Sequence, residues 1–284
     1  MAYLVIVSII WAFSFPLIGH YLAGSVDNYF SILVRFGLAF LVFAPLINWK
    51  ICGALKLKLI GIGAIQIGIM YICYYQSFLY LSVSEVALFT IFTPFYVTLI
   101  YDICSKHFRA WYLLSIFIAV LGAYIIKYGS INSHFLIGFL LIQVANLCFG
   151  AGQSLYKFVI ENESNIKQSE CFGYFYLGAL MVGAFSFLFF GNGENLPTTA
   201  IQWGILFYLG IIASGLSYFL WNRGACLVDS GILAIMNNVL IPLAILINFL
   251  FFGRDIENSI QFAIGSVFIA TSLLLHLKLM KRYH

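Results

Sequence analysis

The chain has 284 residues, of which 63% are hydrophobic and 8% charged, and its formal net charge is +4. Ordinary soluble domains carry about 25% charged residues, so this composition excludes a soluble protein. Cysteine, histidine and acidic residues show no metal-ligand or catalytic spacing, so we expect no enzyme, no metal site and no cofactor. The few positive charges lie between apolar stretches, which excludes a nucleic-acid-binding protein.

Apolar stretches of the length that crosses a bilayer as a helix follow one another along the whole chain. Short polar connections separate them. The first stretch lacks a basic leader and a small-residue cleavage site, so we expect a retained helix and not a signal peptide. We predict an all-α integral membrane protein with ten spans, at about residues 2–23, 29–48, 57–80, 83–104, 110–128, 135–157, 169–191, 200–222, 227–251 and 259–279.

Lysine and arginine are distributed unequally between the two sides of the predicted membrane. Eleven of them lie in the loops and tail on the side of the N-terminus, two lie on the opposite side, and Arg35 lies within a span. Positively charged loops stay in the cytoplasm. We therefore expect a multi-pass protein of the inner membrane, embedded in the lipid bilayer with both termini cytoplasmic.

Two stretches share one plan, a tight polar turn followed by an apolar helix with a proline inside it. They read SVSEVALFTIFTP at residues 82–94 and DSGILAIMNNVLIP at residues 229–242. Proline pushes away the carbonyl four residues earlier, so we expect freed carbonyls at Thr90 and Asn238. An unpaired carbonyl is costly in hydrocarbon and must face protein, water or a ligand. We predict a cavity beside both helices, with Pro94 and Pro242 as gating hinges.

The repeated plan divides the chain into two halves of five spans, residues 1–130 and 131–284. A repeat with an odd number of spans enters the membrane from opposite sides in its two copies. We therefore predict two inverted five-helix repeats, an architecture typical of secondary transporters.

Several motifs together resemble one known family. They are WAFSFP at 11–16, LVRFGLAF at 33–40, the two proline stretches, and the glycines of VLGAYI at 120–125 and AIGSVFIA at 263–270. The chain resembles ten-helix transporters of the EamA type in the drug/metabolite transporter superfamily. The resemblance covers the whole chain. It implies transport of small organic metabolites through a central cavity formed by both repeats, with the fifth and tenth helices at the periphery.

Aromatic rings and neutral polar groups recur at helical spacing on several spans, a mixture typical of small-molecule sites. The alternative is ordinary helix packing, in which hydroxyls hydrogen-bond their own helix and amides hydrogen-bond a neighbouring helix. The expected cavity-lining, substrate-binding residues are Trp11, Ser14, Phe15, Gln66, Tyr74, Phe89, Thr90, Thr93, Asn146, Gln153, Ser217, Trp221, Asn237 and Asn238.

Arg35 lies about two turns into the second span. An arginine inside the membrane is a functional candidate, here one that attracts a substrate carboxylate. The alternatives are a structural ion pair with Glu85, which enters the membrane from the same side, and a side chain that extends to the membrane surface.

These observations predict a transporter that works by alternating access, as a facilitator or exchanger, because no carboxylate lies at the expected midplane. On the resemblance, amino acids that are aromatic or otherwise zwitterionic are the leading substrates. A nucleoside-bearing metabolite such as S-adenosylmethionine would also suit an aromatic lining. A drug exporter is a further alternative, and a scaffold or sensor without transport is another. The resemblance implies a monomeric transport unit and leaves a dimer open.

Overall fold

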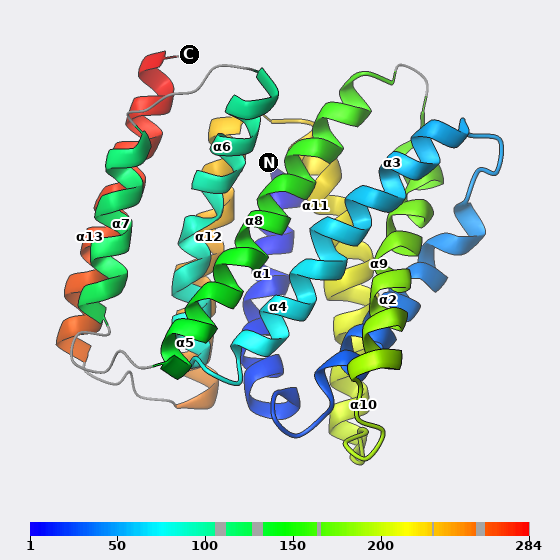
Figure 1. The fold of residues 1–284 in the computed structure, drawn as a ribbon, viewed down its shortest axis with the longest axis horizontal. Helices are drawn as coiled ribbons and strands as arrows, with labels where there is room; N and C mark the ends of the chain where they lie inside the picture. Colours follow the sequence, from blue (N-terminus) through cyan, green and yellow to red (C-terminus); the bar gives the residue numbers. More distant parts are fainter. Residues whose placement is uncertain (106–111, 127–132, 164–165, 229, 254–258, 284) are drawn as a thin grey trace.

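The computed structural model describes the whole chain except residues 106–111, 127–132, 164–165, 229, 254–258 and 284. Within the described residues the chain forms ten continuous helical rods (Figure 1). The first half holds α1 (Ala2–Leu17) with η1 (Ile18–Leu22), α2 (Asn28–Phe43) with η2 (Ala44–Leu46), α3 (Gly53–Gly63) with η3 (Ala64–Ile69) and α4 (Met70–Ser77), α5 (Val83–Phe89) with η4 (Thr90–Phe92) and α6 (Thr93–Ser105), and α7 (Tyr112–Ile126). The second half holds α8 (Ser133–Glu161), α9 (Gln168–Phe190), α10 (Ala200–Phe207) with η5 (Tyr208–Leu216) and α11 (Ser217–Ala225), α12 (Ser230–Phe252) and α13 (Ser259–Tyr283).

Many of these rods have the length and composition of membrane spans. Six are long and apolar enough to cross a bilayer, and shorter apolar helices cover residues 83–97, 239–252 and 263–272. Their ends lie within about one helical turn of the predicted ends. The prediction of an all-α membrane protein is confirmed.

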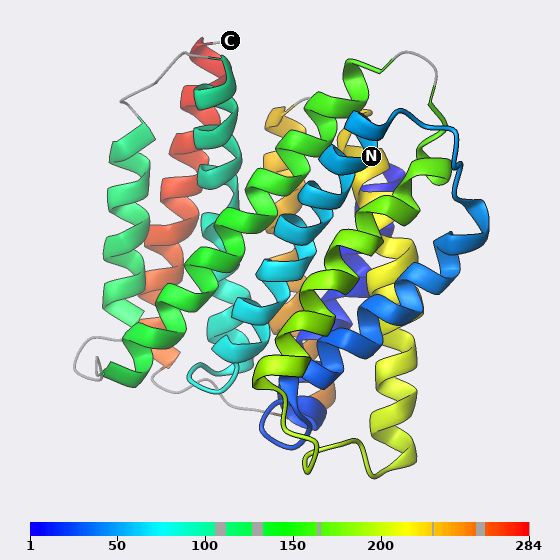
Figure 2. The ribbon, with the colours of Figure 1, turned by 45° about the vertical axis from the view of Figure 1, so that its right-hand side comes forward.

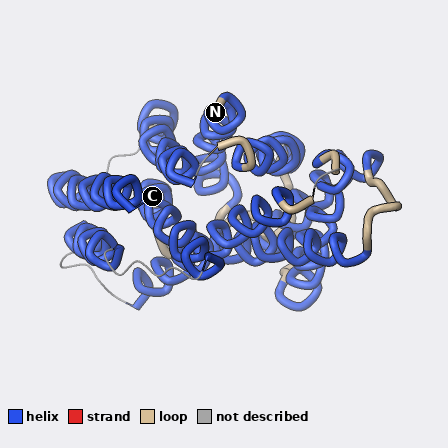
Figure 3. The backbone as a smooth tube through the Cα atoms, turned by 90° about the horizontal axis from the view of Figure 1, so that it is seen from above, coloured by secondary structure: helices blue, strands red, loops and turns tan. Residues whose placement is uncertain are grey.

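One pair of rods stands at the edge of the bundle. α7 and α13 pack against each other and lie outside the group that contains α1, α8 and α12 (Figures 1 and 2). They are the fifth and tenth rods, the two that the resemblance places at the periphery. Seen from above in Figure 3, the described chain consists of helices and the loops between them.

Each rod of the first half makes the same kind of contacts as its counterpart in the second half. α1 packs on α12 and its counterpart α8 packs on α6, while α2 packs on η5 and its counterpart α9 packs on η3. α2 also pairs with α9, and α7 with α13. α1 and α8 run in opposite directions in Figure 1. This is the arrangement that an inverted repeat produces, and the boundary at residue 130 stays a prediction.

The rods of η3 and η5, which correspond in the two halves, each contain a π-helical stretch. A π-turn shifts the backbone hydrogen bonds and leaves carbonyl groups available to side chains, often at functional sites. In η5, Trp11 Nε1 donates to the Ala213 carbonyl at 2.7 Å, and the Tyr176 hydroxyl donates to the carbonyls of Ser214 and Gly215 at 2.6 and 2.7 Å. These bonds hold α1 and α9 against η5, and the sequence analysis did not predict them.

Candidate functional site: a cavity between the two halves

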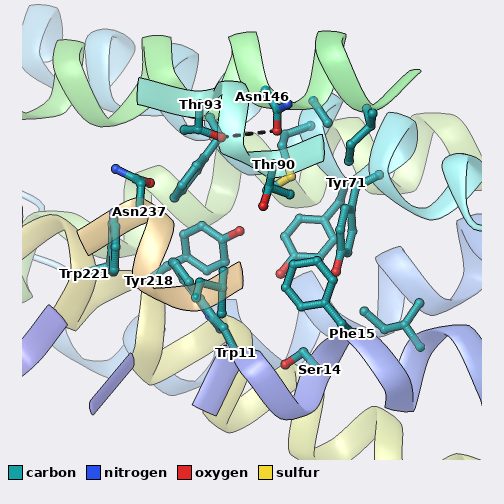
Figure 4. A pocket seen from close by; sticks show the side chains of 17 residues that line it. Trp11, Ser14, Phe15, Tyr71, Thr90, Thr93, Asn146, Tyr218, Trp221 and Asn237 are labelled. Carbon is teal, nitrogen blue, oxygen red and sulfur yellow. Dashed lines mark hydrogen bonds between the residues drawn. The ribbon is translucent and has the colours of Figure 1, made fainter. Parts of the chain in front are cut away.

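A cavity that is partly open to solvent lies inside the bundle between rods of both halves. We call it the central cavity, and Figure 4 shows its lining. The lining is aromatic, aliphatic and neutral polar, and consists of Trp11, Ser14, Phe15, Ile18, Met70, Tyr71, Tyr74, Thr90, Thr93, Ile142, Ala145, Asn146, Phe149, Tyr218, Trp221, Asn237 and Leu240.

The helix break at η4 places Thr90 and Thr93 on the central cavity. The helix tightens to a 3₁₀ turn over Thr90–Phe92 and begins again at Thr93, so Pro94 occupies the first turn of α6. Proline is well tolerated there because a first-turn N–H has no partner within the helix. The chain thus accommodates Pro94 by starting a new helix at Thr93.

The break leaves the Thr90 carbonyl paired. The Thr93 amide donates to it within the 3₁₀ turn, so the expected free carbonyl at Thr90 is wrong. Asn146 Nδ2 donates to the Phe89 carbonyl at 2.8 Å, and Asn146 Oδ1 accepts from Thr93 Oγ1 at 3.2 Å (Figure 4). Asn146 therefore holds the broken helix against α8.

The corresponding proline helix is built differently. α12 continues through Pro242 from Ser230 to Phe252. Asn237 lines the central cavity, and its Nδ2 donates to its own helix at Leu233 at 2.9 Å and to Gln153 Oε1 at 3.4 Å. The side chains of Asn238 and Pro242 lie outside the described residues, so their expected contacts stay predictions.

Aromatic rings gather at one end of the central cavity. The Trp11 ring lies 4.9 Å from Trp221, 4.8 Å from Tyr218 and 5.8 Å from Phe149, measured between centroids. Trp221 Nε1 donates to Gln153 Oε1 at 3.1 Å, which fixes the indole. Ring faces held in this way can stack on a flat or bicyclic ligand.

A group of buried amides adjoins Trp221. Gln66 Nε2 donates to Asn222 Oδ1 at 3.0 Å, and a Cβ on Gly152 would collide with Gln66, so only glycine allows α8 this close to η3. Three atoms of the group, Gln66 Oε1, Gln153 Nε2 and Asn222 Nδ2, have no hydrogen-bond partner among the described residues. Because unpaired buried amides are costly, this group has spare capacity for water or for polar atoms of a ligand.

Arg35 lies beside Tyr71 of the lining, 4.4 Å from its ring centroid, and is completely buried, with an exposed fraction of 0%. It donates to the hydroxyls of Tyr75 at 2.8 Å, Tyr71 at 2.7 Å and Ser214 at 2.9 and 3.0 Å. The Glu85 carboxylate accepts from the Ser82 amide at 2.8 Å and from the Ser82 hydroxyl at 2.9 Å in a helix cap, and the ion pair with Arg35 stays a prediction. Full burial excludes a side chain that extends to the membrane surface.

The structure brings together most of the predicted cavity residues. Trp11, Ser14, Phe15, Tyr74, Thr90, Thr93, Asn146, Trp221 and Asn237 line the central cavity. Gln66 and Gln153 lie in the amide group beside it, and the Ser217 hydroxyl is buried without a partner among the described residues. Phe89 packs on Phe135 and Phe139, at 6.0 and 5.2 Å between centroids. The four residues Gln66, Phe89, Gln153 and Ser217 are therefore outside the lining, contrary to expectation.

Other lining residues were not predicted as site residues. They include Tyr71 and Phe149, with the aliphatic side chains Ile18, Ile142, Ala145 and Leu240. Met70 and Tyr218 also line the cavity and share helical faces with the expected residues Tyr74 and Trp221. Tyr71 and Tyr74 follow each other at a spacing of three residues on α4, so the helical period could have identified Tyr71 beside Tyr74. The aliphatic members carry no signal that separates them from packing residues.

Comparison with known proteins agrees with this architecture. Residues 1–128 and 136–276 match the EamA-like transporter family. A protein of Escherichia coli (strain K12) named "Biotin transporter" is 44% identical over 98% of this chain and 93% of its own length. A "Probable biotin transporter" of Pseudomonas aeruginosa (strain PAO1) is 45% identical over 96% of both chains.

A solved crystal structure shares the fold. It superimposes with a TM-score of 0.69 at 13% identity and covers 100% of this chain and 99% of its own. An identity of 13% supports a shared fold and nothing more. The family match and the relatives, which cover nearly the whole chain, support membership of the family. The protein belongs to the EamA-like transporter family and is a multi-pass membrane transporter of a small molecule.

Proposed function

We propose that the protein transports biotin. The observation that supports this most directly is the 44% identity to the Escherichia coli biotin transporter along 98% of the chain. The names of the relatives favour biotin over the amino acids and the S-adenosylmethionine expected from the sequence.

The chemistry of biotin matches the lining of the central cavity. Biotin has a compact bicyclic ring with a thioether on one side and a urea group on the other, and an aliphatic tail that ends in a carboxylate. The rings of Trp11, Tyr218 and Trp221 offer flat apolar faces for the bicycle. Asn146 and Asn237 offer amide groups of the kind that pair with the carbonyl and N–H groups of a urea.

Transport by alternating access, as a facilitator or exchanger, belongs to the same proposal. All the residues that line the central cavity are uncharged, and they come from rods of both halves, whose relative movement would open the cavity to each side in turn. The proposed setting is the inner membrane, with both termini in the cytoplasm and a single chain as the transport unit. The eleven cations on the side of the N-terminus support this orientation.

Quenching of tryptophan fluorescence by biotin, measured on purified protein in lipid nanodiscs, tests the site. Trp11 and Trp221 line the central cavity, whereas Trp49 is 74% exposed. We expect saturable quenching that Trp221→Phe reduces by about half and that Trp49→Phe leaves unchanged. Saturable quenching by an aromatic amino acid or by S-adenosylmethionine, with none by biotin, would overturn the proposal.

A further inference from the structure

We propose that Arg35 and Tyr71 form an anion subsite at one end of the central cavity, which binds a carboxylate of the transported molecule. The inference rests on the proposed function for the identity of that molecule, biotin. It goes further because it assigns a binding partner to the buried, charged side chain of Arg35 and gives the substrate an orientation in the cavity.

The first observation is the unbalanced charge of Arg35. Its exposed fraction is 0%, and its hydrogen bonds go to two phenols and one serine, all of them neutral. Because a buried charge is costly unless a counter-charge compensates it, stable burial of this guanidinium favours a state in which an anion is near. Among the described residues, no carboxylate hydrogen-bonds to it.

The second observation is the position of Tyr71 between this charge and the central cavity. Tyr71 lines the cavity, and the Arg35 Cζ atom lies 4.4 Å from its ring centroid. The Tyr71 oxygen accepts from Arg35 Nη2 at 2.7 Å, and the Tyr71 hydroxyl also hydrogen-bonds Tyr218, another residue of the lining. A hydroxyl that accepts from a cation is a stronger donor, so Tyr71 offers the cavity a polarised O–H suited to a carboxylate.

The third observation is the separation of Tyr71 from Trp221 and Asn237. In Figure 4, Tyr71 lies on the side of the cavity opposite Trp221 and Asn237. A ligand with a polar ring at one end and an anion at the other can therefore engage both. For biotin, the urea would lie toward Asn237 and the carboxylate toward Tyr71.

Ligand pairs that differ only in the carboxylate test this assignment. One pair is biotin and its neutral carboxamide, and the other is phenylacetate and phenylacetamide. The affinity of each ligand is measured by equilibrium binding to the protein in nanodiscs. Charge-assisted hydrogen bonds in a buried site are worth about tenfold in affinity or more. We expect the wild-type protein to prefer biotin over its amide by about that factor, and Arg35→Gln to abolish the preference.

Two tyrosine variants distinguish binding of the substrate carboxylate from structural support of Arg35. They can be measured even if the Arg35→Gln protein does not fold. Tyr71 and Tyr75 each accept one hydrogen bond from Arg35, at 2.7 and 2.8 Å, but only Tyr71 lines the central cavity. We expect Tyr71→Phe to lower the preference for the acid at least fivefold. Tyr75→Phe should weaken the acid and the amide alike and keep the preference.

The outcomes distinguish the subsite from the proposed function. Equal preferences in the Tyr71→Phe and Tyr75→Phe variants would overturn the subsite and leave a purely structural role for Arg35. A wild-type protein that binds biotin and its amide equally would overturn it too. If neither biotin nor its amide binds, but phenylacetate is preferred over phenylacetamide through Tyr71, the subsite stands and biotin is the wrong substrate.

Discussion

The two proline helices have similar sequences and different structures. Around Pro94 the chain breaks into α5, a 3₁₀ turn and α6, whereas around Pro242 a single helix runs from Ser230 to Phe252. Both helices contribute to the central cavity, the first through Thr90 and Thr93 and the second through Asn237 and Leu240. A shared local pattern therefore does not determine whether a helix breaks.

The difference lies in the partner that each helix meets. α8 packs on α6 and provides Asn146, whose amide bonds the Phe89 carbonyl at the helix break at 2.8 Å. α1 packs on α12, but its buried serines bond their own helix, Ser8 at Leu4 and Ser14 at Ile10. A neighbouring side chain that bonds the backbone at a helix break stabilises the break. The break at Thr90 thus depends on a residue more than fifty positions away, and changes to that contact should have the largest effect.

Replacing Asn146 with alanine should be the most damaging change to this contact. It removes the 2.8 Å bond to the Phe89 carbonyl and the 3.2 Å bond from Thr93, each of which contributes about 1 kcal/mol. We expect a clear fall in the thermal unfolding midpoint and a loss of biotin transport of at least about tenfold.

Asn237→Ala is the matched control, because Asn237 bonds chiefly its own helix, at Leu233. Its unfolding midpoint should fall less. An Asn146→Ala protein as stable as Asn237→Ala would show that the break does not need its cap.

Pro94→Ala should reduce transport more than Pro242→Ala does. Without the proline, residues 83–105 can form a continuous helix, which would turn Thr90 and Thr93 away from their present positions. At Pro242 the helix is already continuous, so alanine adds a backbone hydrogen bond and moves little. Initial rates of biotin exchange at matched protein amounts measure the difference, and equal losses would contradict it.

Thr93→Val should have the smallest effect of the three. It removes the 3.2 Å bond from Thr93 Oγ1 to Asn146 Oδ1 and keeps the shape of the side chain. Because a neutral hydrogen bond contributes about 1 kcal/mol, biotin affinity should fall about threefold to tenfold. Thr90→Val is the control, since the Thr90 hydroxyl donates to its own helix at Ala87 at 2.7 Å. A larger loss in Thr90→Val would show that substrate contacts Thr90 instead.

The fold was largely predictable from the sequence, because ten apolar stretches of bilayer length allow few other arrangements. The position of the cavity followed from the proline at residue 94, which lies at the helix break, and from Asn146 of α8, which bonds the broken helix. The partner of Arg35 was not predictable. Charge alone favoured Glu85, but Ser82 donates to that carboxylate in a helix cap. The guanidinium bonds the phenols of Tyr71 and Tyr75 on α4.

The π-helical stretches η3 and η5 explain a second limit of prediction. No residue type marks a π-turn, yet η5 holds Ser214 against Arg35 and presents the Ala213 carbonyl to Trp11. Gln66 and Gln153 were expected to line the cavity because of their polarity. Close packing at Gly152 instead places Gln66 against α8 and Asn222, beside the cavity. Such contacts depend on how two rods approach each other, which a single sequence does not encode locally.

Counterflow of biotin in proteoliposomes tests the central claim most directly. Vesicles loaded with unlabelled biotin would receive a trace of labelled biotin outside, with and without an imposed pH gradient. We predict saturable accumulation of the label that the gradient does not change and that an excess of biotin abolishes. Absence of biotin exchange, together with exchange of an aromatic amino acid or of S-adenosylmethionine in the same vesicles, would contradict the account.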